Sequence, residues 1–120
     1  MEGYLEGVEV VSMDYRQLFD QFRLVSNVVF VLDPPYLSTD CGMYKSDSYW
    51  RLTDYLDVLK CLQGTRFVYF TSSKSAIIEL ADWMGQNQAI GNPFDGAKVH
   101  RLHVGSIALN YDDIMLVKAI

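Results

Sequence analysis

The 120-residue sequence is 50% hydrophobic and carries 10 Lys and Arg against 15 Asp and Glu, a formal net charge of −5. A chain of this size and composition can bury a core, which excludes an intrinsically disordered protein. Its longest wholly apolar run, Val28–Leu32, is far shorter than the roughly 20 residues of a membrane-spanning helix. The acidic balance, without a cluster of basic residues, argues against a large nucleic-acid footprint on this chain alone. We expect one cytoplasmic α/β domain over residues 1–120, with no membrane contact.

The first quarter of the chain predicts a strand, a helix and a second strand. Val8–Val11 is a short β-branched run that predicts a strand. Asp14 is a good N-cap for an amphipathic helix that begins at Tyr15. Val28–Leu32 is hydrophobic at every position and is followed by Asp33, Pro34 and Pro35. This run is typical of a strand that is buried on both faces of a parallel sheet.

The middle of the chain predicts two further helices separated by a strand. Ser48 can cap a helix that ends at Gly64, where a glycine accommodates a left-handed residue. Thr65–Thr71 predicts another buried strand, and Ser72 or Ser73 can cap the helix that follows it. That helix is expected to stop at residue 85, a glycine.

Two strands are expected at the end of the chain, over Lys98–Val104 and Ile114–Ala119, joined as a hairpin. The complete order of elements predicts an α/β fold with a mostly parallel sheet and an antiparallel hairpin at the carboxyl-terminal end. Ligands of such sheets bind beyond the carboxyl ends of the strands, which is where Asp33-Pro34-Pro35-Tyr36 stands. We expect this segment to line an open cleft.

The Asp33-Pro34-Pro35-Tyr36 segment combines the groups that a planar amine would need. Two consecutive prolines fix the backbone and leave carbonyl oxygens free to accept hydrogen bonds. A carboxylate and a proline carbonyl could together hold the two hydrogens of an amino group, while Tyr36 offers a flat surface for stacking. These residues therefore point to alkylation of a ring amino group.

This segment resembles the catalytic motif of adenine-specific DNA methyltransferases, in particular the Dam-like class. Looser similarities extend over nearly the whole chain. Four segments of this chain resemble segments of the family. They are the acidic-aromatic pair Asp14-Tyr15, the predicted helical residues 49–56, the small polar residues at the end of the strand near Ser72, and Asn110-Tyr111 near the end of the chain. The resemblance implies a Rossmann-like, S-adenosylmethionine-dependent methyltransferase fold.

The resemblance also implies roles for individual residues. Asp33 and the Pro34 carbonyl would hold the adenine amino group, and Tyr36 would stack on the flipped base. Asp14 and Tyr15 would border the adenosine end of S-adenosylmethionine. The reaction would be an in-line displacement that needs no metal.

Further aromatic and imidazole side chains have weaker indications of function. Tyr44 and Tyr49 could form a second base-stacking wall, or could pack as half-buried side chains. His100 and His103 stand three residues apart in a predicted strand, so they point to opposite faces and do not suggest a metal site.

The chain also departs from the family. No glycine-rich turn after a first strand precedes Asp33, and no basic target-recognition insert is present. We therefore expect the carboxyl-terminal part of a methyltransferase, with its first strands missing; the alternative is a non-catalytic remnant or a complementing subunit. The predicted strand Val28–Leu32, which precedes the Asp-Pro-Pro-Tyr motif, would then be left at an edge of the sheet. That edge would be covered by self-association, by Val8–Val11, or by the missing amino-terminal half.

Overall fold

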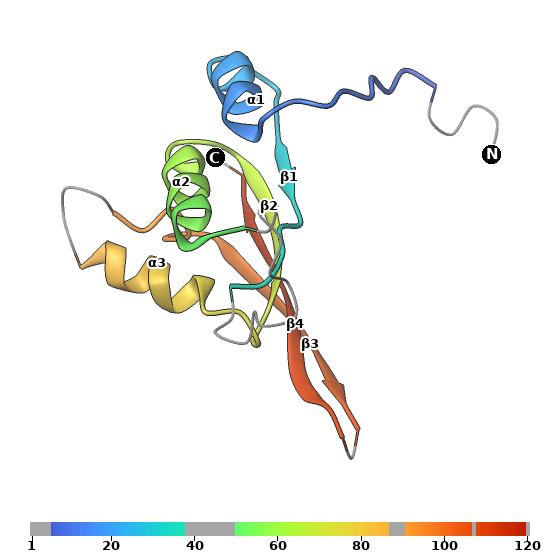
Figure 1. Cartoon of the computed structure of the whole chain (residues 1–120), viewed down its shortest axis with the longest axis vertical. Coiled ribbons are helices and arrows are strands. Elements are labelled where there is room, and N and C mark those ends of the chain that lie inside the picture. The colour runs from blue at the N-terminus through green and yellow to red at the C-terminus, as the bar shows by residue number, and fades with distance from the viewer. Residues whose placement is uncertain (1–5, 38–49, 87–90, 107, 120) are drawn as a thin grey trace.

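Four strands and three helices make up the computed structural model, which describes residues 6–37, 50–86, 91–106 and 108–119. In chain order the elements are α1 (Tyr15–Phe22), β1 (Phe30–Leu32), α2 (Leu52–Leu62), β2 (Phe67–Ser72), α3 (Ile77–Gly85), β3 (Lys98–Gly105) and β4 (Asn110–Lys118). The order of strands in the sheet is β1-β2-β4-β3, so the last strand of the chain lies between the second and the third (Figure 1).

The sheet is mixed. The pair β1 and β2 runs parallel, whereas β2 with β4 and β4 with β3 run antiparallel. The α/β architecture and the carboxyl-terminal hairpin agree with the expectation. The expected mostly parallel sheet is wrong for the described strands, because the hairpin strand β4 inserts next to β2 and reverses the direction there.

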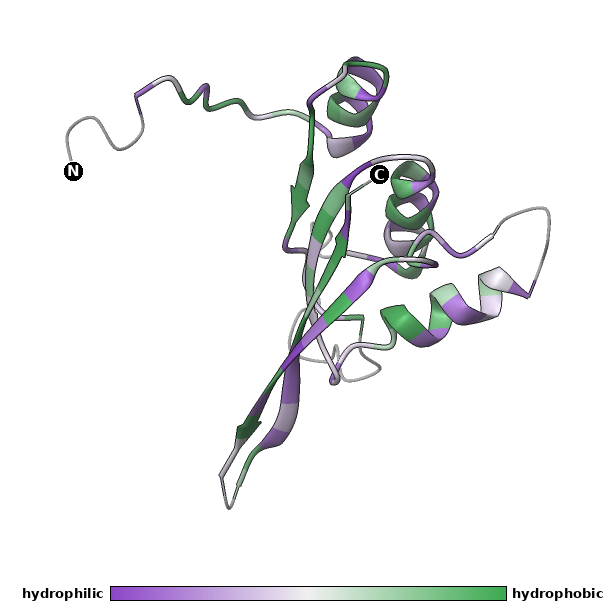
Figure 2. Ribbon diagram, turned by 180° about the vertical axis from the view of Figure 1, so that it is seen from behind, coloured by the Kyte–Doolittle hydropathy of each residue, from purple (hydrophilic) through white to green (hydrophobic). Residues whose placement is uncertain are grey.

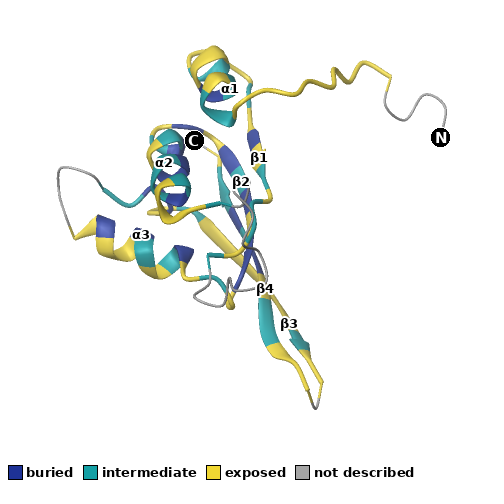
Figure 3. Ribbon diagram, in the orientation of Figure 1, coloured by how far each residue is buried: buried dark blue, intermediate teal, exposed yellow. Residues whose placement is uncertain are grey.

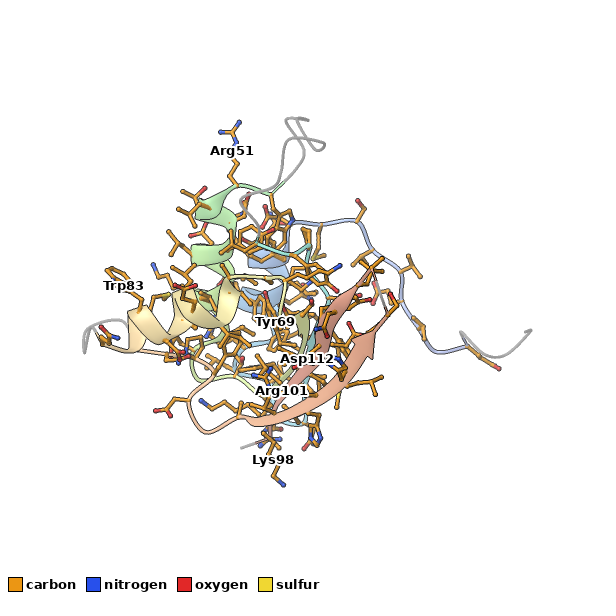
Figure 4. The ribbon with its side chains drawn as sticks, turned by 90° about the horizontal axis from the view of Figure 1, so that it is seen from below. Arg51, Tyr69, Trp83, Lys98, Arg101 and Asp112 are labelled. Atoms are coloured by element: carbon orange, nitrogen blue, oxygen red, sulfur yellow. The ribbon has the colours of Figure 1, made fainter. Side chains whose placement is uncertain are left out.

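The hydrophobic core lies on one face of the sheet, beneath all three helices (Figure 1). Alternate strand residues point into it, so that Phe67 and Tyr69 of β2 are buried beside Ile114 and Leu116 of β4. Figure 4 shows Tyr69 in the middle of this layer, and its ring packs edge-on against Phe94 with centroids 5.2 Å apart. The helices supply the other wall with Phe19, Tyr55, Val58, Leu59, Leu62, Ile77, Ala81 and Met84.

The predicted strand at Val8–Val11 is wrong. These residues have no regular secondary structure, and the segment runs away from the sheet as an exposed arm (Figures 1 and 3). A strand is stable only with a neighbour to take its backbone hydrogen bonds, and none of the described strands lies alongside this arm. This also excludes Val8–Val11 as the cover of the β1 edge in this structure.

The prediction of a strand buried on both faces at Val28–Leu32 is wrong in extent and in burial. Only Phe30–Leu32 forms a strand. Phe30 is buried against the Phe19 ring, with ring centroids 4.2 Å apart. Val31 is 67% exposed, because the helices cover only one face and β1 pairs only with β2 among the described strands.

The helix ends agree in part with the predicted caps. Asp14 caps α1 by accepting a hydrogen bond from the Arg16 amide at 2.8 Å, and Gly64 has a positive φ of 73° after α2. Ser48 lies outside the described residues, and the N-cap of α2 is Arg51, whose amide donates to Asp54 at 2.7 Å.

The helix after β2 begins later than the capping prediction implied. The N-cap position of α3 is Ala76, and the Ser75 hydroxyl accepts a hydrogen bond from the Ile77 amide at 3.3 Å. Ser72 instead accepts from the Lys74 amide at 3.0 Å, within the turn that leads to the helix. Among the described residues, no helix is long and apolar enough to cross a membrane.

Candidate functional site

The Asp33–Tyr36 segment leaves β1 at its carboxyl end and crosses the end of the sheet without regular structure. Asp33 is exposed, and the Tyr36 side chain is 39% exposed. Within the part of the chain that the structure describes, neither the Pro34 nor the Pro35 carbonyl accepts a hydrogen bond. The Asp33 carboxylate and the Tyr36 ring are therefore exposed, while Pro34 and Pro35 are half-buried.

The backbone of Tyr36, the last residue of the motif, and of Leu37 after it is anchored by three hydrogen bonds. The Tyr55 hydroxyl of α2 donates to the Tyr36 carbonyl at 3.2 Å. The Leu37 amide donates to the Ser75 hydroxyl at 2.9 Å, and the Leu37 carbonyl accepts from the Ala76 amide at 2.8 Å. These bonds tie the segment to α2 and to the start of α3, so the motif is held against two separate elements.

An open cavity of about 490 Å³ adjoins the motif and is called the motif cavity here. Asp33 and Tyr36 form one side of it, and the remaining lining comes from β2, β3 and β4, including Phe70, His100 and Met115. Asp33 and Tyr36 therefore line an open cavity, as predicted for this segment, whereas Pro34 and Pro35 are not among its lining residues. The cavity combines a carboxylate, an imidazole and aromatic surface, a lining that suits a polar planar ring.

Asp14, expected near the methyl donor, stands at the start of α1 and takes part in an ion-pair network. Its carboxylate lies 3.0 Å from the Arg16 guanidinium, which also reaches Asp54 at 3.3 Å and Asp57 at 2.7 Å. The contacts with Asp57 and Asp54 join α1 to α2. The Asp14 carboxylate is exposed, so it can accept further hydrogen bonds from a ligand.

Tyr15 is half-buried and has several partners of its own. Its hydroxyl donates to the Asp54 carbonyl at 3.2 Å. Its ring stacks with Trp50 at a centroid distance of 5.4 Å, and the Arg16 guanidinium lies over it at 4.7 Å. Burial raises the pKa of Tyr15 to about 12, against the lowering effect of Arg16. Tyr15 is thus suited to shape a site, and less suited to stack on a ligand.

Aromatic contacts connect Tyr15 to the motif. Trp50 packs against the core and meets the Tyr55 ring edge-on at a centroid distance of 5.1 Å. Tyr55 in turn holds the Tyr36 carbonyl. The structure therefore brings the start of α1 and the Asp33–Tyr36 segment to the same end of α2. Tyr44 and Tyr49 lie outside the described residues.

Tyr55 and Ser75 support the motif but were not singled out as site residues from the sequence. Tyr55 occupies a hydrophobic position on the predicted helix, which indicates a core residue, and its ring is indeed buried in the core. Ser75 lies in a turn rich in serine. Each makes its contact through one hydroxyl group. Tyr55 bonds to Tyr36, 19 residues away in the chain, and Ser75 bonds to Leu37, 38 residues away. The sequence around them contains no signal for these two bonds.

Replacing Tyr55 with Phe should destabilise the domain by about 0.5–1.5 kcal/mol, because the ring stays packed while the bond to the Tyr36 carbonyl is lost. Urea unfolding measures the change. The matched control is Tyr111→Phe, which removes a hydroxyl that has no hydrogen bond to another described residue. Equal losses in the two variants would show that the bond to Tyr36 contributes nothing specific.

His100 and His103 lie on opposite faces of β3, as their spacing predicts. In the antiparallel register His100 is opposite Met115 and His103 is opposite Asp112. The His103 Nδ1 atom is 2.8 Å from the Asp112 carboxylate, which also lies 3.4 Å from Arg101 (Figure 4). No group of three or more metal-ligand side chains occurs in the described ranges.

The hydrogen bond from His103 holds the pKa of Asp112 below its ordinary value. Because the pKa is lower in the folded state, the pair stabilises the hairpin at neutral pH, and this contribution is lost as pH falls through the lowered pKa. A carbon-13 titration of the carboxyl groups should show the low value in the native protein. His103→Ala should raise it, and His100→Ala should leave it unchanged. A normal pKa before mutation would contradict this.

The protein thus has an α/β fold with a partly exposed Asp-Pro-Pro-Tyr segment at the end of a parallel strand. A comparison with known proteins finds 34% identity over 87 residues with a Haemophilus influenzae protein named "Putative methyltransferase". The match includes 72% of this chain and 29% of that relative, so the chain spans less than a third of the length of the relative. No family model and no solved structure matches the chain. This chain is therefore similar to part of a methyltransferase-like protein.

Proposed function

We propose that this chain carries the acceptor site of an adenine-specific DNA methyltransferase. The observation that carries the proposal is the Asp33-Pro34-Pro35-Tyr36 segment at the end of β1, which is anchored by Tyr55 and whose exposed Asp33 and Tyr36 line the motif cavity. The similarity to a protein named as a methyltransferase supports the reaction class. The resemblance of the segment to the Dam-like motif supports adenine in DNA as the acceptor.

In the proposed reaction the chain holds an amino group rather than activating it with a strong base. The Asp33 carboxylate and the Pro34 carbonyl accept hydrogen bonds from the two N–H groups of the adenine amine. Both are acceptors, so together they orient the nitrogen with its electron pair toward the methyl donor. Tyr36 stacks on the base, which has to leave the duplex to reach the cavity.

S-adenosylmethionine would supply the methyl group: the N–CH3 bond would form as the sulfonium S–CH3 bond breaks, S-adenosylhomocysteine would leave, and the amino nitrogen would release one proton to water. Of the two residues expected beside S-adenosylmethionine, Asp14 fits, because its exposed carboxylate can accept from ribose hydroxyl groups. Tyr15 fits as a border, since its ring and hydroxyl already have partners. Tyr44 and Tyr49 are proposed as additional contacts to the DNA base. Residues beyond this chain would have to complete the donor site, because the sequence lacks the glycine-rich turn of the family.

The alternative function is that of a non-catalytic remnant or complementing subunit. The match includes only 29% of the relative, and this small share supports the alternative. Titrating S-adenosylmethionine into the chain by calorimetry separates the two. Micromolar binding would contradict the non-catalytic alternative, and no binding would restrict the enzyme proposal to a longer or two-part protein.

The decisive assay for the enzyme measures transfer of a tritiated methyl group to duplex DNA. The chain is assayed alone and together with the part of the Haemophilus relative that lies outside the matched residues. We expect N6-methyladenine after digestion of the DNA. Labelled cytosine, or labelled protein with unlabelled DNA, would overturn adenine in DNA as the acceptor.

A further inference from the structure

The motif cavity extends from the end of β1 across β2 and β4 to β3, well beyond the Asp33–Tyr36 segment. Besides Asp33 and Tyr36, its lining includes Phe70 of β2, Met115 of β4 and His100 of β3. Figure 2 shows hydrophilic residues in purple along β3, which is the edge strand of the sheet farthest from β1. The cavity therefore has a second polar side, on β3, opposite the motif.

Four of the lining residues form one row across the sheet, called the cavity row here. The parallel register of β1 and β2, continued by one residue, brings Asp33 level with Phe70. Phe70 is opposite Met115, and Met115 is opposite His100. Side chains that face each other in such pairs lie on the same side of the sheet. Because neighbouring strands are about 4.8 Å apart, the backbone at the two ends of the row is separated by roughly 14 Å.

The cavity row has a different chemical character at each end. The Asp33 carboxylate accepts hydrogen bonds, whereas the His100 imidazole can donate one. Phe70 and Met115 form a hydrophobic floor between the two ends, and a thioether beside an aromatic ring is a favourable support for a planar group. His100 is exposed, and its ring has no hydrogen bond to another described residue. A ligand that fits the row has an amino group at one end, a flat middle part and an acceptor group at the other end.

The charges near His100 favour an anion as that acceptor group. Lys98 lies two residues earlier on the same face of β3, since side chains alternate along a strand, and Figure 4 shows it pointing away from the helices. Within the described residues neither Lys98 nor His100 forms an ion pair. Arg101 also lines the cavity, but its guanidinium is paired with a carboxylate of β4. Asp113 is opposite Leu102, on the side of His100 that faces the hairpin turn, so an anion fits best on the Lys98 side.

We propose that His100 binds the phosphate of the acceptor nucleotide, the same nucleotide whose amino group lies at Asp33. This inference rests on the proposed function and adds a residue to it. A nucleotide has its ring amino group and its phosphate at opposite ends, as the cavity row requires. The base lies against Tyr36 and Phe70, the sugar lies over Met115, and a phosphate oxygen accepts a hydrogen bond from His100. His100 is thus a binding residue that sets how far the base enters the cavity.

The test compares two ligands, deoxyadenosine 5′-monophosphate and deoxyadenosine, whose binding to the chain is followed by nuclear magnetic resonance. The phosphate adds a charge-assisted hydrogen bond, so the monophosphate should bind about tenfold more tightly. His100→Ala should remove this difference and leave deoxyadenosine binding unchanged. His103→Ala is the matched control and should keep the difference, because the His103 ring lies on the other face of β3, beside Asp112. Asp33→Ala should weaken both ligands by the same factor.

The outcomes separate the His100 contact from the rest of the site. Equal binding of the two ligands by the unmodified chain would overturn the proposal, as would no binding of either ligand. A tenfold preference that survives His100→Ala would do the same, and an Asp33→Ala variant that binds both ligands normally would show that the nucleotide does not span the row. Circular dichroism checks folding, and His100→Phe, which keeps a ring without an N–H donor, replaces His100→Ala if that variant unfolds.

The comparison contains no methyl donor. Failure of the proposed methyl transfer would therefore leave the preference for the monophosphate interpretable, and loss of that preference would leave methyl transfer to be judged by its own assay.

Discussion

Asp33→Ala is expected to lower the rate of methyl transfer by at least about 100-fold, while binding to duplex DNA changes by no more than about threefold. The carboxylate is proposed to contact only the amino group of the flipped adenine. That contact gains strength as the nitrogen attacks, so its loss raises the barrier more than it weakens ground-state binding. Single-turnover kinetics and fluorescence anisotropy measure the two quantities separately.

The control for Asp33→Ala is Asp95→Ala, which removes an exposed carboxylate from a turn that does not line the motif cavity. Its kinetics should match those of the unmodified protein. If Asp33→Ala weakens DNA binding and methyl transfer by the same factor, Asp33 contributes to binding or structure and not to the chemical step. Both variants are assayed in the preparation that shows methyl transfer, either the chain alone or the chain with the added part of the Haemophilus relative. Asp33 is exposed in the chain described here.

Leu59→Ala should destabilise the domain by about 2–5 kcal/mol, a large fraction of the stability of a protein of this size. Leu59 is completely buried on the sheet-facing side of α2, in the core it shares with Phe67 and Tyr69. Truncating it removes hydrophobic contacts and leaves a cavity that the surrounding helices and strands fill only in part.

The matched control for this prediction is Leu52→Ala in the first turn of the same helix. Leu52 is 55% exposed, so the same substitution there should cost less than about 1 kcal/mol. Urea unfolding monitored by circular dichroism gives both values. Similar losses at the two positions would mean that α2 does not pack on the sheet as described.

Local features of the sequence determined most of the individual elements. The hydrophobic spacing after Asp14 predicts α1, and the capping hydrogen bond of Asp14 is present. Gly64 ends α2 because it adopts a positive φ that other residues avoid. The position of Asp33–Tyr36 at the end of a strand also follows from the sequence, since the prolines that carry the proposed chemistry also terminate the strand.

Only the tertiary structure decided how these elements pair and which surfaces remain open. Val8–Val11 has strand-like residues, but a strand needs a partner, and residue composition does not supply one. The insertion of β4 between β2 and β3, the exposure of Val31, and the bond from Tyr55 to the Tyr36 carbonyl all depend on residues distant in the chain. Helix caps and turns are set by neighbouring residues, whereas strand order, burial and site support come from contacts between segments that meet only when the sheet forms.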